Sequence, residues 1–196
     1  MVARSCVFCL CAFAILTPLH AYTTSYTRDV SYSQPPDNYN WFRKVNYNIG
    51  ETWRKTHIYE LYTPVFAWHN RLTYDSEHIR RYNEATLGLG IGATRYDKDG
   101  DTHSLCFMAF RDSNYYYQTV FGYLFVKNWY TQSKNASVGI GWSCLLTQRK
   151  EYNYIPLPLI LPVGSLGYRR INFQLTYVPG GKNDGNVLFC WFKCSF

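Results

Sequence analysis

The sequence predicts an all-β fold, an eight-stranded antiparallel transmembrane β-barrel with a short N-terminal amphipathic α-helix. Three observations predict this class. Large and small residues alternate with a period of two through most of the chain after residue 57, turn signals divide that region into eight segments, and an apolar N-terminal segment indicates export. The chain has 196 residues, which suits one domain over residues 37–196.

The N-terminal segment has the features of a secretory signal peptide. Arg4 supplies a short basic region, residues 5–17 are uncharged and mostly apolar, and Ala21 ends a suitable cleavage site. We therefore expect residues 1–21 to be a signal peptide and residues 22–36 to be a flexible lead-in. No later segment has the ~18 consecutive apolar residues of a transmembrane helix.

Four of the seven cysteines follow the signal peptide, and we expect them to be small apolar residues of the strands: Cys106, Cys144, Cys190 and Cys194. Cys190 and Cys194 lie four residues apart in one predicted strand, about 13 Å, whereas a disulfide needs Cα atoms within about 7 Å. These four cysteines form no CxxC motif and no Cys/His cluster, so we expect no metal and no cofactor. A lipoprotein signal ending at Cys9 or Cys11 is the weaker alternative, because large residues precede both cysteines.

Residues 37–55 predict the amphipathic helix. Asp37 directly follows Pro36 and provides a natural start. Tryptophan near both ends of the helix suits a membrane interface, although packing on a soluble core fits this segment equally well. The apolar residues at helical spacing are Trp41, Phe42, Val45, Ile49 and Trp53.

The clearest strand pattern lies between Tyr115 and Trp129, where aromatic residues dominate the odd positions and smaller residues the even ones. Residues 137–147 repeat the pattern, with large apolar residues on one face and mostly Gly or Ser on the other. This is the inverse of a soluble sandwich and indicates lipid outside with a narrow interior.

Turn signals separate eight candidate strands whose lengths suit a tilted transmembrane strand. An even number of strands closes without free edges, and eight strands enclose room for side chains or one small ligand. The terminal Phe196 resembles the recognition signal of bacterial outer-membrane barrels. The predicted strands are residues 58–74, 86–96, 102–111, 115–130, 136–147, 154–163, 166–178 and 186–196.

Topology places three chemically useful residues at one rim of this barrel. Odd-numbered strands of outer-membrane barrels run outward, so His69 near the end of the first strand meets Asp112 and Ser113, which follow the third. A histidine beside a hydroxyl and a carboxylate can catalyse acyl transfer by taking the proton of an attacking alcohol. An interfacial histidine and an ordinary Asp-Ser turn are the plainer interpretation. The absence of Gly-x-Ser-x-Gly excludes an ordinary α/β-hydrolase.

Several unusual segments occur in the order found in the lipid A palmitoyltransferase (PagP) family, and the resemblance covers roughly residues 40–196. The matching segments are residues 62–71 (YTPVFAWHNR), 81–84 (RYNE), 108–113 (MAFRDS), 153–158 (NYIPLP), 177–180 (YVPG) and 183–187 (NDGNV).

The resemblance implies an integral protein of the bacterial outer membrane, which we expect to be a monomer. It implies transfer of palmitate from the sn-1 position of a phospholipid donor to a hydroxyacyl chain of lipid A, the acceptor within lipopolysaccharide. Three residues take the family's catalytic positions: His69 as the base, Asp112 as its orienting carboxylate, and Ser113. Arg149 matches a further family arginine near the active face and is expected to bind substrate.

The chain departs from the family pattern in the acyl pocket. The glycine that floors the pocket corresponds to Leu124, which shares a face with Gly122 and should point inward. We expect Leu124 and Gly122 to line the pocket, with a bulkier floor that shortens it. The length of the transferred chain is therefore left open.

The chain also departs from the family at the lateral gates. Prolines interrupt hydrogen bonding between strands, and in the family they open gates for lipid. The prolines at positions 64, 156 and 158 are present, whereas their partner positions hold Ala85 and Arg170.

The net charge of +7 suits a partner with anionic phosphates such as lipid A. Nucleic-acid binding is not expected, because the aromatic residues alternate along strands and form no exposed basic platform.

Two functions other than an acyltransferase are compatible with a small barrel. A structural or adhesive barrel would share the strands but has no need of the three rim residues, and a lipocalin-like carrier would need the opposite alternation. The acceptor position, the donor preference, covalent catalysis by Ser113, the cleavage site and regulation stay open.

Overall fold

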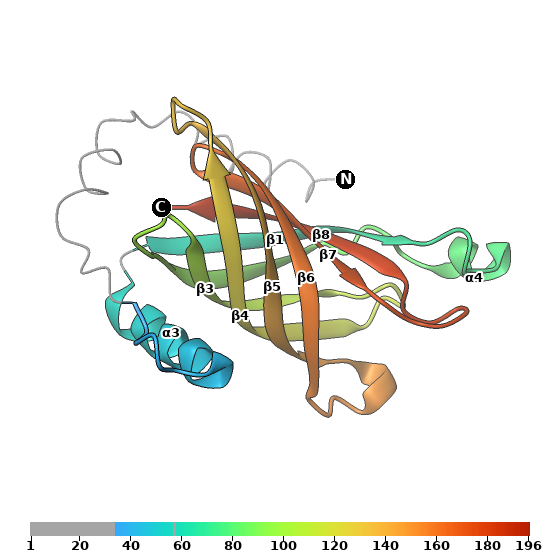
Figure 1. Cartoon of the computed structure of the whole chain (residues 1–196). Coiled ribbons are helices and arrows are strands. Elements are labelled where there is room, and N and C mark those ends of the chain that lie inside the picture. Colours follow the sequence, from blue (N-terminus) through green and yellow to red (C-terminus); the bar gives the residue numbers. More distant parts are fainter. Residues whose placement is uncertain (1–33, 57) are drawn as a thin grey trace.

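The computed structural model describes residues 34–56 and 58–196; the predicted signal peptide and residues 22–33 of the predicted lead-in lie outside the described residues. Eight antiparallel strands close into a barrel in sequence order, with β1 paired to both β2 and β8 (Figure 1). The predicted fold class is therefore confirmed. The strands are β1 (Ile58–His69), β2 (Gly88–Tyr96), β3 (Thr102–Arg111), β4 (Tyr117–Tyr130), β5 (Ala136–Gln148), β6 (Leu157–Tyr168), β7 (Ile171–Val178) and β8 (Val187–Ser195).

Alternation along β4 follows the prediction. Leu124 and Val126 are buried in the barrel, whereas Phe121 and Trp129 are about half exposed on its outer surface, at 53% and 50%. Tyr123 is the exception, since it is an outward residue that is nevertheless buried, and its ring lies near Trp142 at a centroid distance of 5.6 Å. The period of two thus assigned the faces of this strand correctly.

Helix α3 (Trp41–Lys55) begins four residues later than predicted. The side chain of Asn40 accepts a hydrogen bond from the backbone N–H of Arg43 at 3.0 Å and caps the helix. Asp37 instead lies in a turn, closed by a bond from the Tyr39 N–H to the Pro36 carbonyl. The helix packs outside the barrel against β2 and β3, near the end that holds the C-terminus (Figure 1). No helix within the described residues is both long and apolar enough to cross a membrane.

The first strand ends five residues before its predicted end at residue 74. Asn70 stops it, because its carbonyl accepts from the N–H groups of Thr73 and Tyr74 and its side chain accepts from that of Leu72. A short helix that the sequence did not predict follows, α4 (Ser76–Arg81).

The turn between β6 and β7 lies later than predicted. The sequence suggested a break at Gly164 and Ser165, but both lie inside β6 and pair with β7. The chain reverses at Arg169, which has a φ of 53°, in the left-handed region, and whose N–H donates to the Asn135 carbonyl. This contact with a neighbouring turn fixes the reversal at Arg169 and Arg170, where the turn itself contains no glycine.

The start of β6 is also later, at Leu157, because a short 3-10 helix, η1 (Lys150–Tyr152), occupies the preceding link. Asn153 and Tyr154 then adopt left-handed φ values of 51° and 59°.

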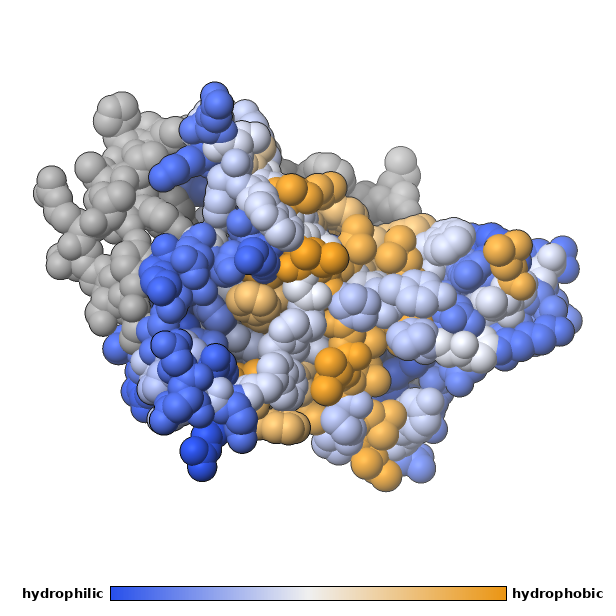
Figure 2. Space-filling model, in the orientation of Figure 1, coloured by the Kyte–Doolittle hydropathy of each residue, from blue (hydrophilic) through white to orange (hydrophobic). Residues whose placement is uncertain are grey.

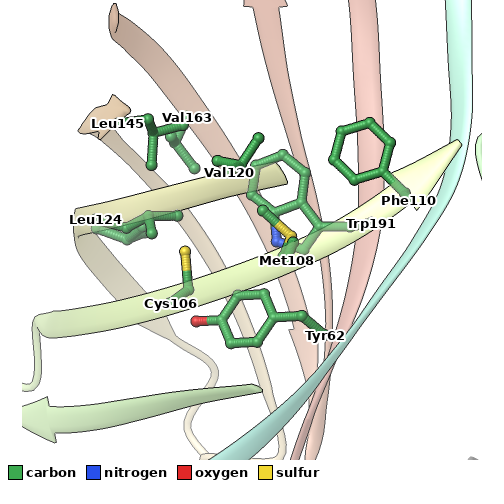
Figure 3. Close-up of a cluster of buried hydrophobic side chains, with 10 residues drawn as sticks. Tyr62, Cys106, Met108, Phe110, Val120, Leu124, Leu145, Val163 and Trp191 are labelled. Atoms are coloured by element: carbon green, nitrogen blue, oxygen red, sulfur yellow. The ribbon is translucent and has the colours of Figure 1, made fainter. Parts of the chain in front are cut away.

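The barrel interior has two zones. One zone is apolar, and Figure 3 shows its side chains converging from several strands across the barrel. The second zone is polar and lies toward the end where β1 begins: Glu60 is paired with Lys193 at 3.1 Å and accepts hydrogen bonds from Tyr62 and Thr94. Buried charges persist only when they are paired, as these are. The apolar cluster comprises Tyr62, Cys106, Met108, Phe110, Val120, Leu124, Val126, Leu145, Val163 and Trp191.

The four cysteines that follow the predicted signal peptide are all free in the structure, including Cys190 and Cys194, whose spacing along one strand excluded a disulfide. Cys106, Cys190 and Cys194 are buried, and Cys144 is exposed.

Candidate active site

A cavity of about 290 Å³ occupies the barrel at the end where β1 finishes, here called the His69 rim. Polar residues line its mouth, and these include His69, Asp112, Ser113 and Arg149. Apolar residues line its interior, and these include Met108, Phe110, Val120, Leu124, Leu145, Leu161 and Trp191. The cavity therefore joins a polar, ionisable mouth to a deep hydrocarbon-like interior.

The structure brings the three predicted catalytic residues to this one cavity. His69 is the last residue of β1, and Asp112 and Ser113 directly follow β3. His69 and Asp112 are both buried, at 3% and 2% exposure. Their convergence follows from barrel topology, as the sequence suggested, and their catalytic roles stay predictions.

Aromatic rings hold the imidazole of His69 on two sides. Tyr82 lies 4.7 Å away between ring centroids at a shallow angle, and Tyr74 lies 5.1 Å away edge to face. The Tyr74 hydroxyl in turn donates to the Gly185 carbonyl at 2.6 Å. Both tyrosines belong to the segment between β1 and β2, so this link builds one wall of the site.

The carboxylate next to His69 is Glu84, which differs from the expectation that Asp112 orients it. Nδ1 of His69 lies 3.3 Å from Oε1 of Glu84, and the His69 backbone N–H donates to the same oxygen at 3.1 Å. Arg71 binds Glu84 with both terminal nitrogens, at 2.6 and 2.8 Å. Sequence reasoning did not single out Glu84, because a contact across 15 residues of a link that contains the unpredicted helix α4 has no periodic signal.

Only one of the two carboxylate oxygens of Asp112 is hydrogen-bonded within its own turn. Its Oδ1 accepts backbone hydrogen bonds from Asn114 and Tyr116, both at 2.9 Å. Its Oδ2 is buried and has no hydrogen-bond partner among the described residues. A buried carboxylate oxygen without a partner is costly, so this oxygen is available to a substrate hydroxyl or to a protonated histidine.

Arg149 lines the mouth, as expected of a substrate-binding residue. Its Nη2 pairs with Glu151 at 3.0 Å, and its Nε is buried without a hydrogen-bond partner among the described residues. Leu124 lines the interior and is buried, as expected for the pocket floor.

Gly122 does not line the cavity, in contrast to the expectation. A Cβ atom at this position would lie 2.2 Å from the Cys144 carbonyl oxygen and 2.8 Å from the Leu145 Cα. Gly122 therefore permits the close approach of β4 and β5, and its own atoms do not line the cavity.

Replacing Gly122 by valine is expected to destabilise the barrel by about 1–3 kcal/mol or more, because the new side chain overlaps backbone atoms of β5. Denaturant unfolding in detergent, followed by circular dichroism, measures the loss. Gly181→Ala is the control, since a Cβ there would meet nothing within 4 Å. An unchanged midpoint for Gly122→Val would contradict the close approach.

Two ladders of the barrel stop short of the His69 rim. The β1–β2 ladder ends at the pair Tyr62 and Gly90, although β1 continues to His69. The β6–β7 ladder reaches only the pair Val163 and Thr176, although β6 begins at Leu157. Pro64 and Pro158 lie where β1 has no partner in β2 and β6 has none in β7, although Pro64 is in register with Trp191 of β8 and Pro158 with Leu146 of β5. Side openings toward the cavity are therefore compatible with the pairing, even with Ala85 and Arg170 at the partner positions.

Acid is expected to remove the stabilising contribution of Glu84. The Arg71 guanidinium lowers the pKa of Glu84 to about 2, and the hydrogen bonds from His69 act in the same direction. A depressed folded-state pKa contributes stability above the unfolded value, near 4.3, and this contribution is lost as pH falls toward 2. The difference in unfolding free energy between wild type and Glu84→Gln should therefore be constant above about pH 5 and shrink toward pH 2.

Denaturant unfolding across this pH range checks the expectation, with Glu77→Gln as the control. Glu77 lies on the exposed helix α4, pairs with Arg81 and carries the same charge. A wild-type to Glu84→Gln difference that does not change between pH 5 and pH 2 would contradict the Arg71–Glu84 pairing.

Within residues 34–56 and 58–196, no group of three or more His, Cys, Asp or Glu side chains is placed to hold a metal ion.

Comparison with known proteins agrees with this geometry. The profile of the family described as "Antimicrobial peptide resistance and lipid A acylation protein PagP" matches residues 48–193. The protein named lipid A acyltransferase PagP from Salmonella typhi is 42% identical over 157 residues, covering 80% of this chain and 83% of that protein. The protein of the same name from Pectobacterium atrosepticum is 42% identical over 154 residues, covering 78% and 71%. The Dickeya dadantii protein of that name is 36% identical over 197 residues, covering 100% and 98%.

Proposed function

The chain belongs to the PagP family of lipid A acylation proteins, and we propose on that basis that it transfers an acyl chain from a phospholipid to lipid A in the bacterial outer membrane. One observation carries the proposal: a single cavity joins His69, Asp112 and Ser113 at its mouth to an apolar interior. An acyl chain fits such an interior, and its ester then lies at the mouth beside the ionisable side chains.

The proposed chemistry is a transesterification. The donor carbonyl carbon is attacked by the hydroxyl oxygen of a hydroxyacyl chain of lipid A, and Nε2 of His69 takes the hydroxyl proton. The bond from the carbonyl carbon to the glycerol sn-1 oxygen breaks, and this oxygen receives the proton from His69 and leaves as the alcohol of a lysophospholipid. Asp112 Oδ2 accepts a hydrogen bond from the reacting groups, and the positive charge of Arg149 faces the anionic headgroups.

Ser113 takes one of two roles in this scheme. Its hydroxyl either donates a hydrogen bond to the ester or first accepts the acyl chain itself. Detection of an acylated protein after rapid quenching separates the two routes.

The surface supports a location in the membrane. Figure 2 shows hydrophobic residues gathered across the middle of the face in view, between hydrophilic ends. Strand residues with exposed apolar side chains include Leu89, Ile91, Phe107, Phe121, Ile140 and Ile160. An exposed apolar area of this extent on a closed barrel is typical of contact with lipid.

Helix α3 adds to this interpretation. Phe42 and Trp53 are 75% and 78% exposed and point away from the barrel. Aromatic residues of this kind anchor amphipathic helices at the membrane interface, which favours the interfacial role over packing on a soluble core.

The test is mass spectrometry of lipid A from cells that express the chain, with phospholipid made available in the outer leaflet. The proposal expects a gain of one acyl chain, and it expects Ser113→Ala to reduce or abolish that gain. No gain from a barrel shown to be folded in the outer membrane would favour a structural role instead.

A further inference from the structure

The acidic residue that His69 contacts comes from the link between β1 and β2. We infer that Glu84, held by Arg71, is the positioning carboxylate of His69: it fixes the proton on Nδ1 and leaves Nε2 as the base that faces the substrate. The inference deepens the proposed function and rests on it for its kinetic test.

The geometry around Glu84 is compact and specific. Oε1 accepts from the His69 backbone N–H, lies 3.3 Å from Nδ1 of the same residue and accepts from Arg71 Nη1 at 2.6 Å. The same Arg71 nitrogen donates to the His69 carbonyl at 2.8 Å. Both the ring and the backbone of His69 are therefore tied to one carboxylate and its arginine.

The charge state of Glu84 decides the tautomer of His69. An ionised carboxylate only accepts hydrogen bonds, so the ring nitrogen that faces it must carry the proton. Arg71 binds both oxygens and keeps Glu84 ionised, and the Arg71 guanidinium itself lies over the Trp68 ring at 5.8 Å. In the neutral imidazole the lone pair then sits on Nε2, on the far side of the ring from Glu84.

The backbone around Glu84 connects both sides of the site. The Glu84 carbonyl accepts from the Ala67 N–H at 2.8 Å, and the Asn83 N–H donates to the Ser113 carbonyl at 2.8 Å. One short segment therefore fixes the end of β1 and the Asp112-Ser113 turn relative to each other. The carboxylate of Glu84 is thus held at a fixed position beside His69, independent of substrate.

Asp112 is poorly placed for the same role. Its Oδ1 is occupied by two backbone N–H groups, and no hydrogen bond joins it to His69 among the contacts of the described residues. The two carboxylates therefore have separate roles. Glu84 positions His69 through Nδ1, and Asp112 faces the reacting groups.

Kinetics of Glu84→Gln in detergent provide the first test. The variant is expected to lower kcat by about 10-fold to 10⁴-fold with little change in KM, because glutamine no longer dictates which nitrogen carries the proton. Glu84→Asp keeps the charge and should recover part of the lost kcat. Glu77→Gln, the matched charge change on α4, should behave as wild type. Equal losses in Glu84→Gln and Glu77→Gln, or a wild-type kcat in Glu84→Gln, would overturn the inference.

Nitrogen-15 NMR of labelled histidine supplies a readout that does not depend on activity. Wild type should show His69 with the proton on Nδ1, assigned by loss of the signal in His69→Asn, and Glu84→Gln should show a mixture of tautomers. An unchanged tautomer in a folded Glu84→Gln barrel would overturn the inference. A Glu84-dependent tautomer in a wild-type chain that transfers no acyl group would instead overturn the proposed function and leave the positioning role standing.

Discussion

His69→Asn is expected to lower the rate of acyl transfer by about 10²–10⁴-fold, the usual contribution of a general base. Asparagine retains a polar side chain of similar reach, but it takes no proton at neutral pH. The substitution leaves the β1 backbone and the Arg71–Glu84 pair intact, so the barrel should still fold. The initial rate of transfer from a defined phospholipid to lipid A, in detergent micelles, measures the loss.

His78→Asn is the matched control for this experiment. His78 lies on α4 near the same rim, its ring centroid is 6.3 Å from that of Tyr82, and it does not line the cavity. Its transfer rate should stay within about twofold of wild type, since it contacts no reacting group. A His69→Asn rate equally close to wild type would contradict general-base catalysis by His69 and favour catalysis by another group at the mouth.

The barrel itself could be predicted because its signal is repeated. Side chains along each strand alternate between the outer surface and the interior, so the faces of residues such as Leu124 and Phe121 follow from local spacing. The strand ends could not be predicted equally well, since they depend on contacts between links. The chain reverses at Arg169, whose N–H donates to the Asn135 carbonyl, and Arg169 is not a turn-favouring residue.

The same distinction between local spacing and contacts made only in the folded chain applies to the candidate active site. The convergence of His69, Asp112 and Ser113 followed from strand direction, and the family resemblance supplied their roles. Glu84 lay in a segment that the resemblance matched, but no spacing rule relates it to His69, and only the folded link between β1 and β2 brings them into contact. For Gly122, alternation along β4 predicts which face of the strand the residue occupies. The sequence does not show how closely β5 approaches it.

Leu124→Gly is expected to shift the product toward longer acyl chains. Leu124 is the residue farthest along β4 from the His69 rim that lines the cavity, and the next inward residue, Val126, does not line it. We therefore expect its side chain to mark the depth at which the end of an acyl chain stops. Removing that side chain extends the cavity, at a stability cost of about 2–5 kcal/mol or somewhat more.

Competition among phospholipids with saturated sn-1 chains of different lengths measures this shift, read by mass spectrometry of the acylated lipid A. Leu146→Gly is the matched control, since Leu146 faces outward on β5 and is 44% exposed. Its chain-length distribution should equal that of wild type, although its stability falls. If Leu124→Gly and wild type transfer the same distribution of acyl-chain lengths, the acyl chain ends elsewhere than at Leu124. A longer distribution for Leu124→Gly alone would assign the depth of the pocket to this single side chain.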